Sequence, residues 1–197
     1  MSTPGRIPPP PPPRPPSIQS PTPARPPQGS PPPVAAPPPP PELPPRTKEL
    51  RDKLLQGIPG AKLDYARPKR IKVTVPPASA KESALFLRDS LGFDHLTLVG
   101  GTDYPATKEM EVVYFVGSPL KPELADFVVL FSERVPRDSP AADSLCEVWP
   151  GAEYHERETF EMLGIDFKGH PDLRRLLLPE DWDDIPPLRK DYTSPGR

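Results

Sequence analysis

Cysteine and histidine are scarce in this chain of 197 residues, which contains one cysteine, Cys146, and three histidines. A single thiol cannot form an internal disulfide, and this favours a reducing compartment. It also cannot hold an iron–sulfur cluster, which takes about four protein ligands. We therefore expect neither a structural disulfide nor an iron–sulfur cluster bound by this chain alone.

Long apolar runs and an excess of positive charge are also missing. No run approaches the roughly 20 apolar residues of a membrane-spanning helix, and we expect no secretion signal at the N-terminus, which has no apolar core. From residue 46 onward the chain has 22 basic and 26 acidic residues. Sequence-independent nucleic-acid binding needs a basic face, so it is not expected here. Work at a membrane would require a partner protein.

Proline, by contrast, is abundant. Residues 1–45 contain 23 of the 38 prolines and no aromatic residue. Such a segment cannot bury enough apolar surface to fold, and its proline runs favour extended polyproline II. We predict a disordered tail over residues 1–45. The run at residues 8–13 has the spacing that aromatic-lined grooves recognise, so recruitment of a partner is an alternative to a plain extension.

The rest of the chain predicts an α+β domain over residues 46–164. Residues 70–75 alternate polar and β-branched side chains, as a strand with one wet face does. Three further strands are expected at 96–99, 111–116 and 127–131, with Gly100 and Gly101 as a break between two of them. The fold class is therefore a mixed, mostly antiparallel sheet of about four strands with helices on one face.

Four helices are expected from capping residues and apolar spacing. Thr47 is a candidate N-cap, and Ser79 with Glu82 has capping-box spacing. Ser139-Pro140 fits an N-cap followed by proline at the first helical position, which would place Cys146 on a helix as a small buried residue. The predicted helices cover residues 48–57, 80–91, 140–148 and 152–163, the last ending at Gly164.

Residues 165–197 predict an extended C-terminal arm. Five prolines interrupt any helix there, yet the segment is rich in leucine and contains Trp182. Such a segment is too apolar for a solvated tail and too irregular for an autonomous unit. We expect the arm to bury its apolar and cationic groups only against neighbouring polypeptides.

Motifs for catalysis, cofactors and metals are missing. Residues 155–159 begin like a zinc-protease pattern, but Thr159 stands where the second histidine is needed. There is no dinucleotide fingerprint and no phosphate-binding loop. Cys146 has no adjacent histidine to activate it. We predict no catalytic, cofactor-binding or metal-binding residue in this chain.

Charged residues concentrate from residue 156 onward. Glu156, Glu158 and Glu161 share the predicted helix 152–163 with Arg157, and the arm carries Arg174, Arg175, Arg189 and Lys190. One interpretation is an exposed helix with weak ion pairs. The other, which we favour, is a protein–protein surface, because arginine pairs bidentately with carboxylates at interfaces.

Residues 156–163 (ERETFEML), followed by His170 and by residues 174–177 (RRLL), resemble the signature of one family of respiratory complex I subunits. This family is the small hydrophilic subunit of the NADH:quinone oxidoreductase, designated by the letter C. The similarity continues through residues 178–182 (LPEDW) and 187–192 (PLRKDY).

The resemblance implies a subunit of an oxidoreductase and translocase complex that has no catalytic residue or cofactor of its own. NADH, FMN, iron–sulfur clusters and quinone are expected in the assembled complex. The implied partners are the large, hydrogenase-like quinone-site subunit and the neighbouring iron–sulfur subunits, at the cytoplasmic face of the cell membrane, with membrane contact only through the complex. The implied interface residues are Glu156, Arg157, Glu158, Glu161, His170, Asp172, Arg174, Arg175, Trp182, Arg189 and Lys190.

Two alternatives remain at this point. The chain could be the equivalent subunit of an energy-converting hydrogenase or an archaeal dehydrogenase that takes another electron donor. It could also be a free-standing interaction module whose proline-rich tail recruits a partner.

Overall fold

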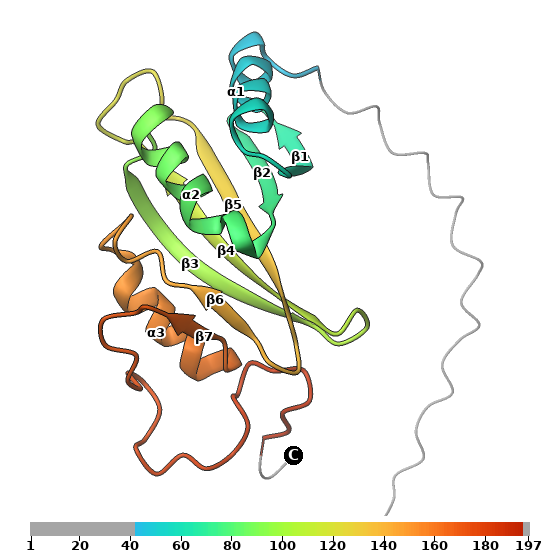
Figure 1. Cartoon of the computed structure of the whole chain (residues 1–197), viewed down its shortest axis with the longest axis vertical. Coiled ribbons are helices and arrows are strands. Elements are labelled where there is room, and N and C mark those ends of the chain that lie inside the picture. The colour runs from blue at the N-terminus through green and yellow to red at the C-terminus, as the bar shows by residue number, and fades with distance from the viewer. Residues whose placement is uncertain (1–41, 195–197) are drawn as a thin grey trace, which may run out of the picture. The chain divides into compact units, whose positions relative to one another are not determined.

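A five-stranded sheet organises the computed structural model, which describes residues 42–194 (Figure 1). The expected proline-rich tail thus lies outside the described residues, except for its last four positions. The order across the sheet is β1-β2-β5-β4-β3. The strands are β1 (Lys62–Arg67), β2 (Arg70–Val75), β3 (His95–Tyr104), β4 (Glu109–Gly117) and β5 (Val128–Pro136).

The sheet is mixed and mostly antiparallel, as predicted. Strands β2 and β5 are parallel, with Arg70 beside Val128, and the other three pairings are antiparallel. The fifth strand, β1, was missed because it has no clear alternation of polar and apolar residues. Its pairing with β2 also shifts register between Leu63 and Tyr65.

The predicted break at Gly100 and Gly101 is wrong, because both residues lie inside β3. A side chain at Gly101 would collide with Leu163 and crowd Thr159, both in helix α3 (Ala152–Leu163). Glycine at this position thus lets the helix pack closely on the strand, which is a recognised use of glycine within a sheet. It does not end the strand.

Most helices lie close to the positions expected from the sequence, but the predicted capping residues do not cap them. Helix α1 (Pro45–Gly57) begins before the expected residue 48, so Thr47 is buried inside it and is not its N-cap. The second helix consists of η1 (Pro77–Ser79), α2 (Ala80–Leu85) and the π-helical turn η2 (Phe86–Ser90). The Ser79 hydroxyl donates back to the Pro76 carbonyl, so the predicted capping box does not form.

The helix predicted over residues 140–148 is wrong. The chain forms the short strand β6 (Ala141–Asp143), which pairs in parallel with β7 (Asp166–Lys168). The backbone nitrogen of Ser144 extends this pairing by donating to the Lys168 carbonyl at 2.8 Å. Cys146 follows in a turn and is half-buried. Strand β7, the partner of β6, comes more than 20 residues later in the chain. A helix prediction from neighbouring residues therefore cannot take it into account.

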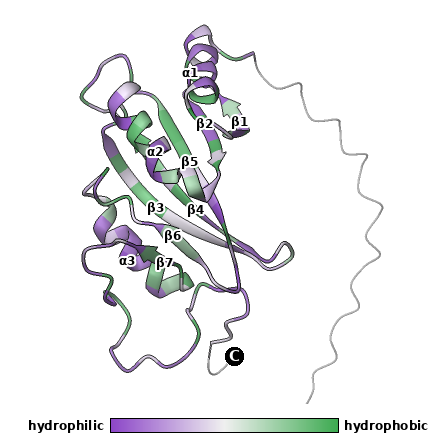
Figure 2. Cartoon of the chain, viewed as in Figure 1, coloured by the Kyte–Doolittle hydropathy of each residue, from purple (hydrophilic) through white to green (hydrophobic). Residues whose placement is uncertain are grey.

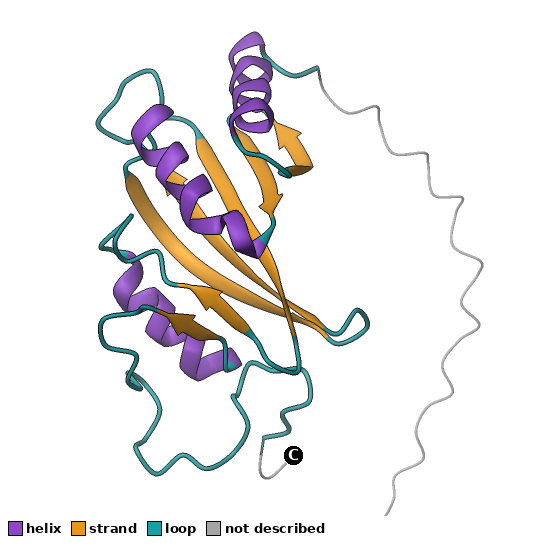
Figure 3. Cartoon of the chain, viewed as in Figure 1, coloured by secondary structure: helices purple, strands orange, loops and turns teal. Residues whose placement is uncertain are grey.

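The hydrophobic core lies on one face of the sheet. One row of neighbours across the strands consists of Val99, Tyr114, Phe131 and Val73, all buried. Helix α2 crosses this face, and α3 approaches β3 from the same side (Figures 1 and 3). Figure 2 shows that the central strands are the more hydrophobic part, whereas the helices carry polar stretches. This is the predicted arrangement of helices on one face.

Within residues 42–194, none of the helices combines the length and the hydrophobicity that a membrane-spanning segment needs.

Candidate docking surface

Helix α3 separates its charged residues between the interior and the solvent. The helix ends at Gly164, whose positive φ of 79° is a conformation that glycine readily adopts. Glu156 and Glu161 are buried, whereas Glu158 is exposed and makes no ion pair with any residue from 42 to 194. The three acids therefore have different roles, although their spacing alone suggested a single one.

Glu156 is an interior residue, with 0% of its surface exposed. Its carboxylate accepts hydrogen bonds from the Tyr114 hydroxyl at 3.1 Å, the Ser144 hydroxyl at 2.6 Å and the Leu145 backbone nitrogen at 2.9 Å. A buried carboxylate needs such partners to offset its lost hydration. Glu156 thus ties α3 to the sheet and to the turn after β6. Its assignment to an exposed interface is wrong.

Cys146, Glu156 and His170 bring possible metal ligands within 4.8 Å of one another. The Nδ1 atom of His170 accepts from the Asp172 backbone nitrogen at 3.0 Å, so Nε2 carries the proton and donates to the Glu153 carbonyl at 3.0 Å. Burial raises the pKa of the Cys146 thiol to about 12. Cys146 donates to the Glu156 carboxylate at 3.4 Å, whereas the ring nitrogens of His170 bond to backbone groups of residues 153 and 172.

Arg157 and Glu161 hold the backbone of the arm. The Glu161 carboxylate accepts from three consecutive backbone nitrogens, those of Leu176 at 2.9 Å, Leu177 at 2.7 Å and Leu178 at 3.2 Å. Arg157 donates from Nε and Nη2 to the carbonyls of residues 174 and 175, each at 2.9 Å. Because five backbone groups are fixed from one helix, the side chains of this segment are presented in a defined geometry.

The predicted cations of the arm lie on this fixed segment. Arg174 makes a bidentate pair with Asp172 at 2.6 and 2.7 Å, and its side chain is 79% exposed. Arg175 donates to the carbonyls of Pro179 and Glu180 at 3.2 and 3.3 Å. Both arginines remain exposed to solvent, where a partner can reach them.

The end of the arm is attached to the sheet by an ion pair that the sequence did not indicate. Asp103 at the end of β3 is buried and pairs with Arg137 at 2.7 and 3.0 Å. Its carboxylate also accepts from the backbone nitrogen of Lys190 at 2.8 Å. Arg137 contacts Asp191 at 2.9 Å, and Arg189 lies 3.3 Å from the same carboxylate. Lys190 is thus held through its backbone, and its exposed side chain is accessible to another contact.

Trp182 stabilises the arm itself. Its indole nitrogen donates to the Asp184 carbonyl at 2.9 Å, and its ring centroid lies 6.0 Å from that of Tyr192. Nearby, the Leu188 backbone nitrogen donates to the Met162 carbonyl of α3 at 2.9 Å. The arm is therefore ordered by contacts within its own chain.

These contacts correct the expectation that the arm buries its groups only against other polypeptides. Its first residues, Ile165 and Phe167, belong to the core, and its backbone is anchored to α3 and to Asp103. Several of its apolar side chains nevertheless remain in solvent, with Leu177 exposed by 61% and Leu188 by 59%. We call the exposed side chains of Tyr154, Arg174, Arg175, Leu176, Leu177, Ile185 and Leu188 the arm surface.

Sequence reasoning found the residues of this region but not their pairings. Arg157 and Glu161 were identified from charge spacing and from the family resemblance, and neither reveals that their partners are backbone groups of the arm. Asp103 and Arg137 were missed because they belong to different strand ends that are 34 residues apart.

Comparison with known proteins identifies the family. Residues 73–197 match the family described as the respiratory-chain NADH dehydrogenase 30 kDa subunit. The chain is 46% identical over 125 residues to the C subunit of the F(420)H(2) dehydrogenase of Methanosarcina mazei, covering 64% of this chain and 77% of that protein. It is 45% identical over 124 residues to the C subunit of the NADH-quinone oxidoreductase of Roseiflexus castenholzii, covering 61% and 68% respectively.

Solved structures share the fold. The trypsin-resistant fragment (1–134) of Nqo5 aligns with a TM-score of 0.55 at 25% identity, covering 65% of this chain and 99% of the fragment. A chain of the archaeal membrane-bound sulfane sulfur reductase aligns with a TM-score of 0.62 at 22% identity, covering 74% and 85%. The α+β fold and the resemblance seen in residues 156–192 are thereby confirmed. The chain belongs to the family of the 30 kDa subunit of respiratory-chain NADH dehydrogenase, the small hydrophilic subunit of complex I.

Proposed function

We propose that this chain is a non-catalytic structural and assembly subunit in the peripheral arm of a complex I-type NADH:quinone oxidoreductase. It docks on the large quinone-site subunit and on neighbouring iron–sulfur subunits, at the cytoplasmic face of the membrane. The complex transfers electrons to quinone and couples this to ion translocation. NADH, FMN, iron–sulfur clusters and quinone are bound by the other subunits.

The observation that carries this proposal is the way Arg157 and Glu161 fix the backbone of residues 174–178. Two buried or half-buried charged groups are committed to presenting leucine and arginine side chains to solvent. Exposed leucines on an ordered segment are unfavourable in a free monomer, and they are typical of a protein–protein interface. A pre-ordered segment also loses less conformational entropy on binding.

The electron donor has a second candidate. Identity to a relative from an F(420)H(2) dehydrogenase, at 46%, is as high as identity to a relative from an NADH-quinone oxidoreductase, at 45%. The same docking role therefore fits a complex that takes electrons from F420H2. In either case the site that binds the electron donor lies outside this subunit, so the donor must be determined on the whole complex.

The test is affinity purification of the tagged full-length chain from its host in mild detergent. We expect hydrogenase-like and iron–sulfur subunits to co-purify, together with quinone reduction by NADH or F420H2. Leu177→Glu places a charge in the arm surface and should lower the recovery of these subunits at least about tenfold. Leu120→Glu is the matched control, because Leu120 is a 90% exposed leucine on the loop between β4 and β5.

Equal recovery of partners with Leu177→Glu and Leu120→Glu would place the docking surface elsewhere. Purification of wild type as a lone monomer, with no oxidoreductase subunit attached, would overturn the proposed function. The donor is settled by which of the two reductants the purified complex oxidises.

A further inference from the structure

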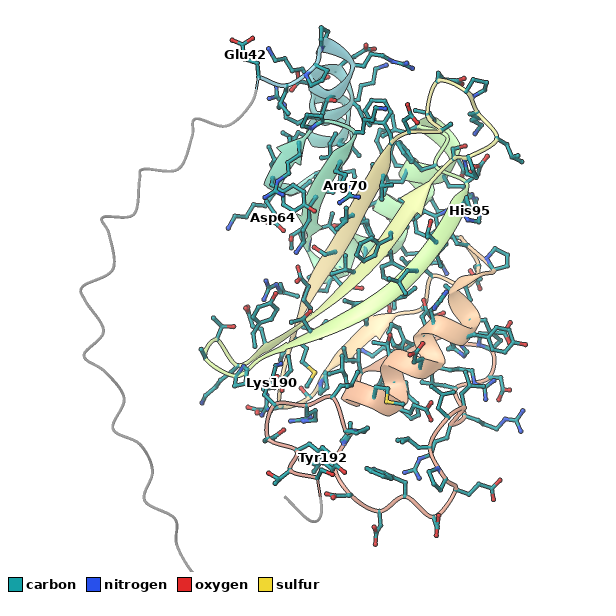
Figure 4. The ribbon with its side chains drawn as sticks, turned by 180° about the vertical axis from the view of Figure 1, so that it is seen from behind. Glu42, Asp64, Arg70, His95, Lys190 and Tyr192 are labelled. Carbon is teal, nitrogen blue, oxygen red and sulfur yellow. The ribbon has the colours of Figure 1, made fainter. Side chains whose placement is uncertain are left out.

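The face of the sheet opposite the core carries an apolar row, and Arg70 of β2 lies on this same face (Figure 4). Register places Leu98 of β3 opposite Phe115 of β4, and Phe115 opposite Leu130 of β5. The row continues through Lys72 of β2 to Tyr65 of β1. Leu98, Phe115 and Leu130 are thus neighbouring apolar residues on this face, with Leu98 exposed and the other two half-buried.

Part of this row borders a hollow of about 320 Å³. Leu98, at the end of the row, is 41% exposed, and the apolar residues of the hollow are half-buried. An apolar hollow on a sheet face is unfavourable in water, and such surfaces mark interaction sites. The residues that line the hollow are Tyr65, Arg70, Thr97, Phe115, Val128 and Leu130.

Charges near the other end of this face are neutralised within the chain. The Lys72 ammonium lies 2.6 Å from the Glu111 carboxylate and 3.5 Å from that of Asp64. Arg134 stacks over the Tyr104 ring at 4.0 Å and lies 3.6 Å from Glu111. This end of the face therefore needs no additional charge from a partner.

Arg70 differs from these neighbours. It lies on β2 beside the hollow, is exposed, and makes no ion pair with any residue that the structure describes. A guanidinium beside an apolar surface favours a carboxylate that arrives with an apolar segment, because the pair is then shielded from water. The chemistry of the site is an apolar hollow with a cation at its edge.

We propose that this hollow is a second docking site, occupied by an apolar segment that carries an acidic side chain and belongs to a neighbouring subunit of the same complex. The inference rests on the proposed function, since it requires such a complex. It adds an interface on the face of β2, β4 and β5. The arm surface is a different one, formed by α3 and the arm.

Two other occupants fit the charge less well. A second copy of the chain, docked through the same face, would bring a hollow without any carboxylate to Arg70. Residues 1–41 of the chain contain three arginines and no acidic residue, so they also offer Arg70 no anion. A neighbouring subunit is the source that can supply both apolar groups and a carboxylate.

Photo-crosslinking in the assembled complex tests the proposal. p-Benzoylphenylalanine replaces Phe115 in the tagged full-length chain, Leu177 in a second strain and Leu120 in a third. After irradiation, the tagged chain is purified and crosslinked peptides are identified by mass spectrometry. We expect Phe115 to crosslink to another subunit, at an apolar segment with an aspartate or glutamate within about five residues. We expect no crosslink from the exposed control at Leu120.

The outcomes at the crosslinking positions distinguish the two proposals. Crosslinks from Leu177 without any from Phe115 would overturn the second docking site and leave the proposed function intact. Crosslinks from Phe115 to a second copy of the chain or to residues 1–41 would also overturn it. If neither position gave a crosslink to an oxidoreductase partner, the proposed function itself would be overturned.

A charge series provides an independent readout. Arg70→Glu should lower recovery of the chain in the complex at least about tenfold, because it opposes the partner carboxylate. Arg70→Lys should retain most of the binding. Lys48→Glu on α1 makes the same change in net charge at another exposed position and should have no effect. Equal recovery for Arg70→Glu and Lys48→Glu would contradict the assigned carboxylate.

Discussion

The carboxylate of Glu161 accepts the backbone N–H of Leu177 at 2.7 Å, which joins the last turns of helix α3 to the middle of the leucine-rich segment. It is the shortest of three such hydrogen bonds. Together they stabilise the carboxylate of Glu161 in its buried position, whereas Glu158 on the same helix is exposed.

Glu161→Gln should loosen the arm while the domain remains folded. A glutamine keeps the size but has one acceptor oxygen, and its amide hydrogens face backbone donors. We expect amide hydrogen exchange at Leu176, Leu177 and Leu178 to accelerate, with a loss of roughly 1–3 kcal/mol of local stability. Glu158→Gln, an exposed neighbour on the same helix, serves as the control. Unchanged exchange in Glu161→Gln would show that other contacts hold the segment.

Glu133 should make stability fall as pH rises. It is buried on the core face of β5, neither carboxyl oxygen has a partner within the described chain, and burial next to the charges of Asp143 and Glu156 raises its pKa to about 8. Between the usual pKa of about 4.5 and this raised pKa, the folded state binds more protons than the unfolded state. The free energy of unfolding should therefore drop by roughly 3–4 kcal/mol across this range.

Urea titrations at pH 5, 7 and 9 measure this drop, and Glu133→Gln should remove it. Exposed Glu123, changed to glutamine, should leave the slope as in wild type. A Glu133→Gln protein with the same pH slope would show that this carboxyl does not hold its proton.

Asp103→Asn should weaken the attachment of the arm's end. The Arg137 guanidinium holds the pKa of the Asp103 carboxyl below its usual range, so the pair stabilises the fold above about pH 4 and this contribution is lost on acidification. Losing a buried partner typically costs about 3 kcal/mol. Asp191→Asn removes the half-exposed contact of the same arginine and should cost about 1 kcal/mol or less. Equal costs for the two variants in urea titrations would contradict this ranking.

Arg174→Ala combined with Arg175→Ala should weaken assembly of the complex. Both arginines are exposed on the fixed segment, and removal of charged groups from an interface typically costs about 2–5 kcal/mol. Native gels of solubilised membranes would measure the amount of intact complex. Normal abundance of the complex in this double variant would exclude these arginines from the interface.

Local patterns were sufficient where one stretch of chain determines its own structure. Strand β2 was found because its open face is polar, and α3 because its apolar spacing ends at Gly164. Ser139-Pro140 is a good helix start, but pairing with β7 selected a strand. Such a choice depends on residues distant in the sequence, which is why the predicted helix failed.

In the candidate surface, too, local sequence identified some features, and others depended on residues distant in the chain. The acids and arginines of residues 156–175 were identified by type and spacing, yet their burial was not. Glu156 and Glu158 are two residues apart with similar chemistry, and one is interior while the other is in solvent. Contacts from distant parts of the chain distinguish them, because Tyr114 of β4 and Ser144 and Leu145 in the turn after β6 meet Glu156.

The parallel pairing of β2 with β5 has a consequence for how the protein matures on the ribosome. Arg70 pairs with Val128, which is synthesised 58 residues later, or on the order of several seconds at typical elongation rates. During that interval the β1–β2 hairpin emerges with one edge unpaired and its apolar side uncovered. Nascent chains stalled before Val128 should therefore bind chaperones more strongly than chains stalled after Pro136.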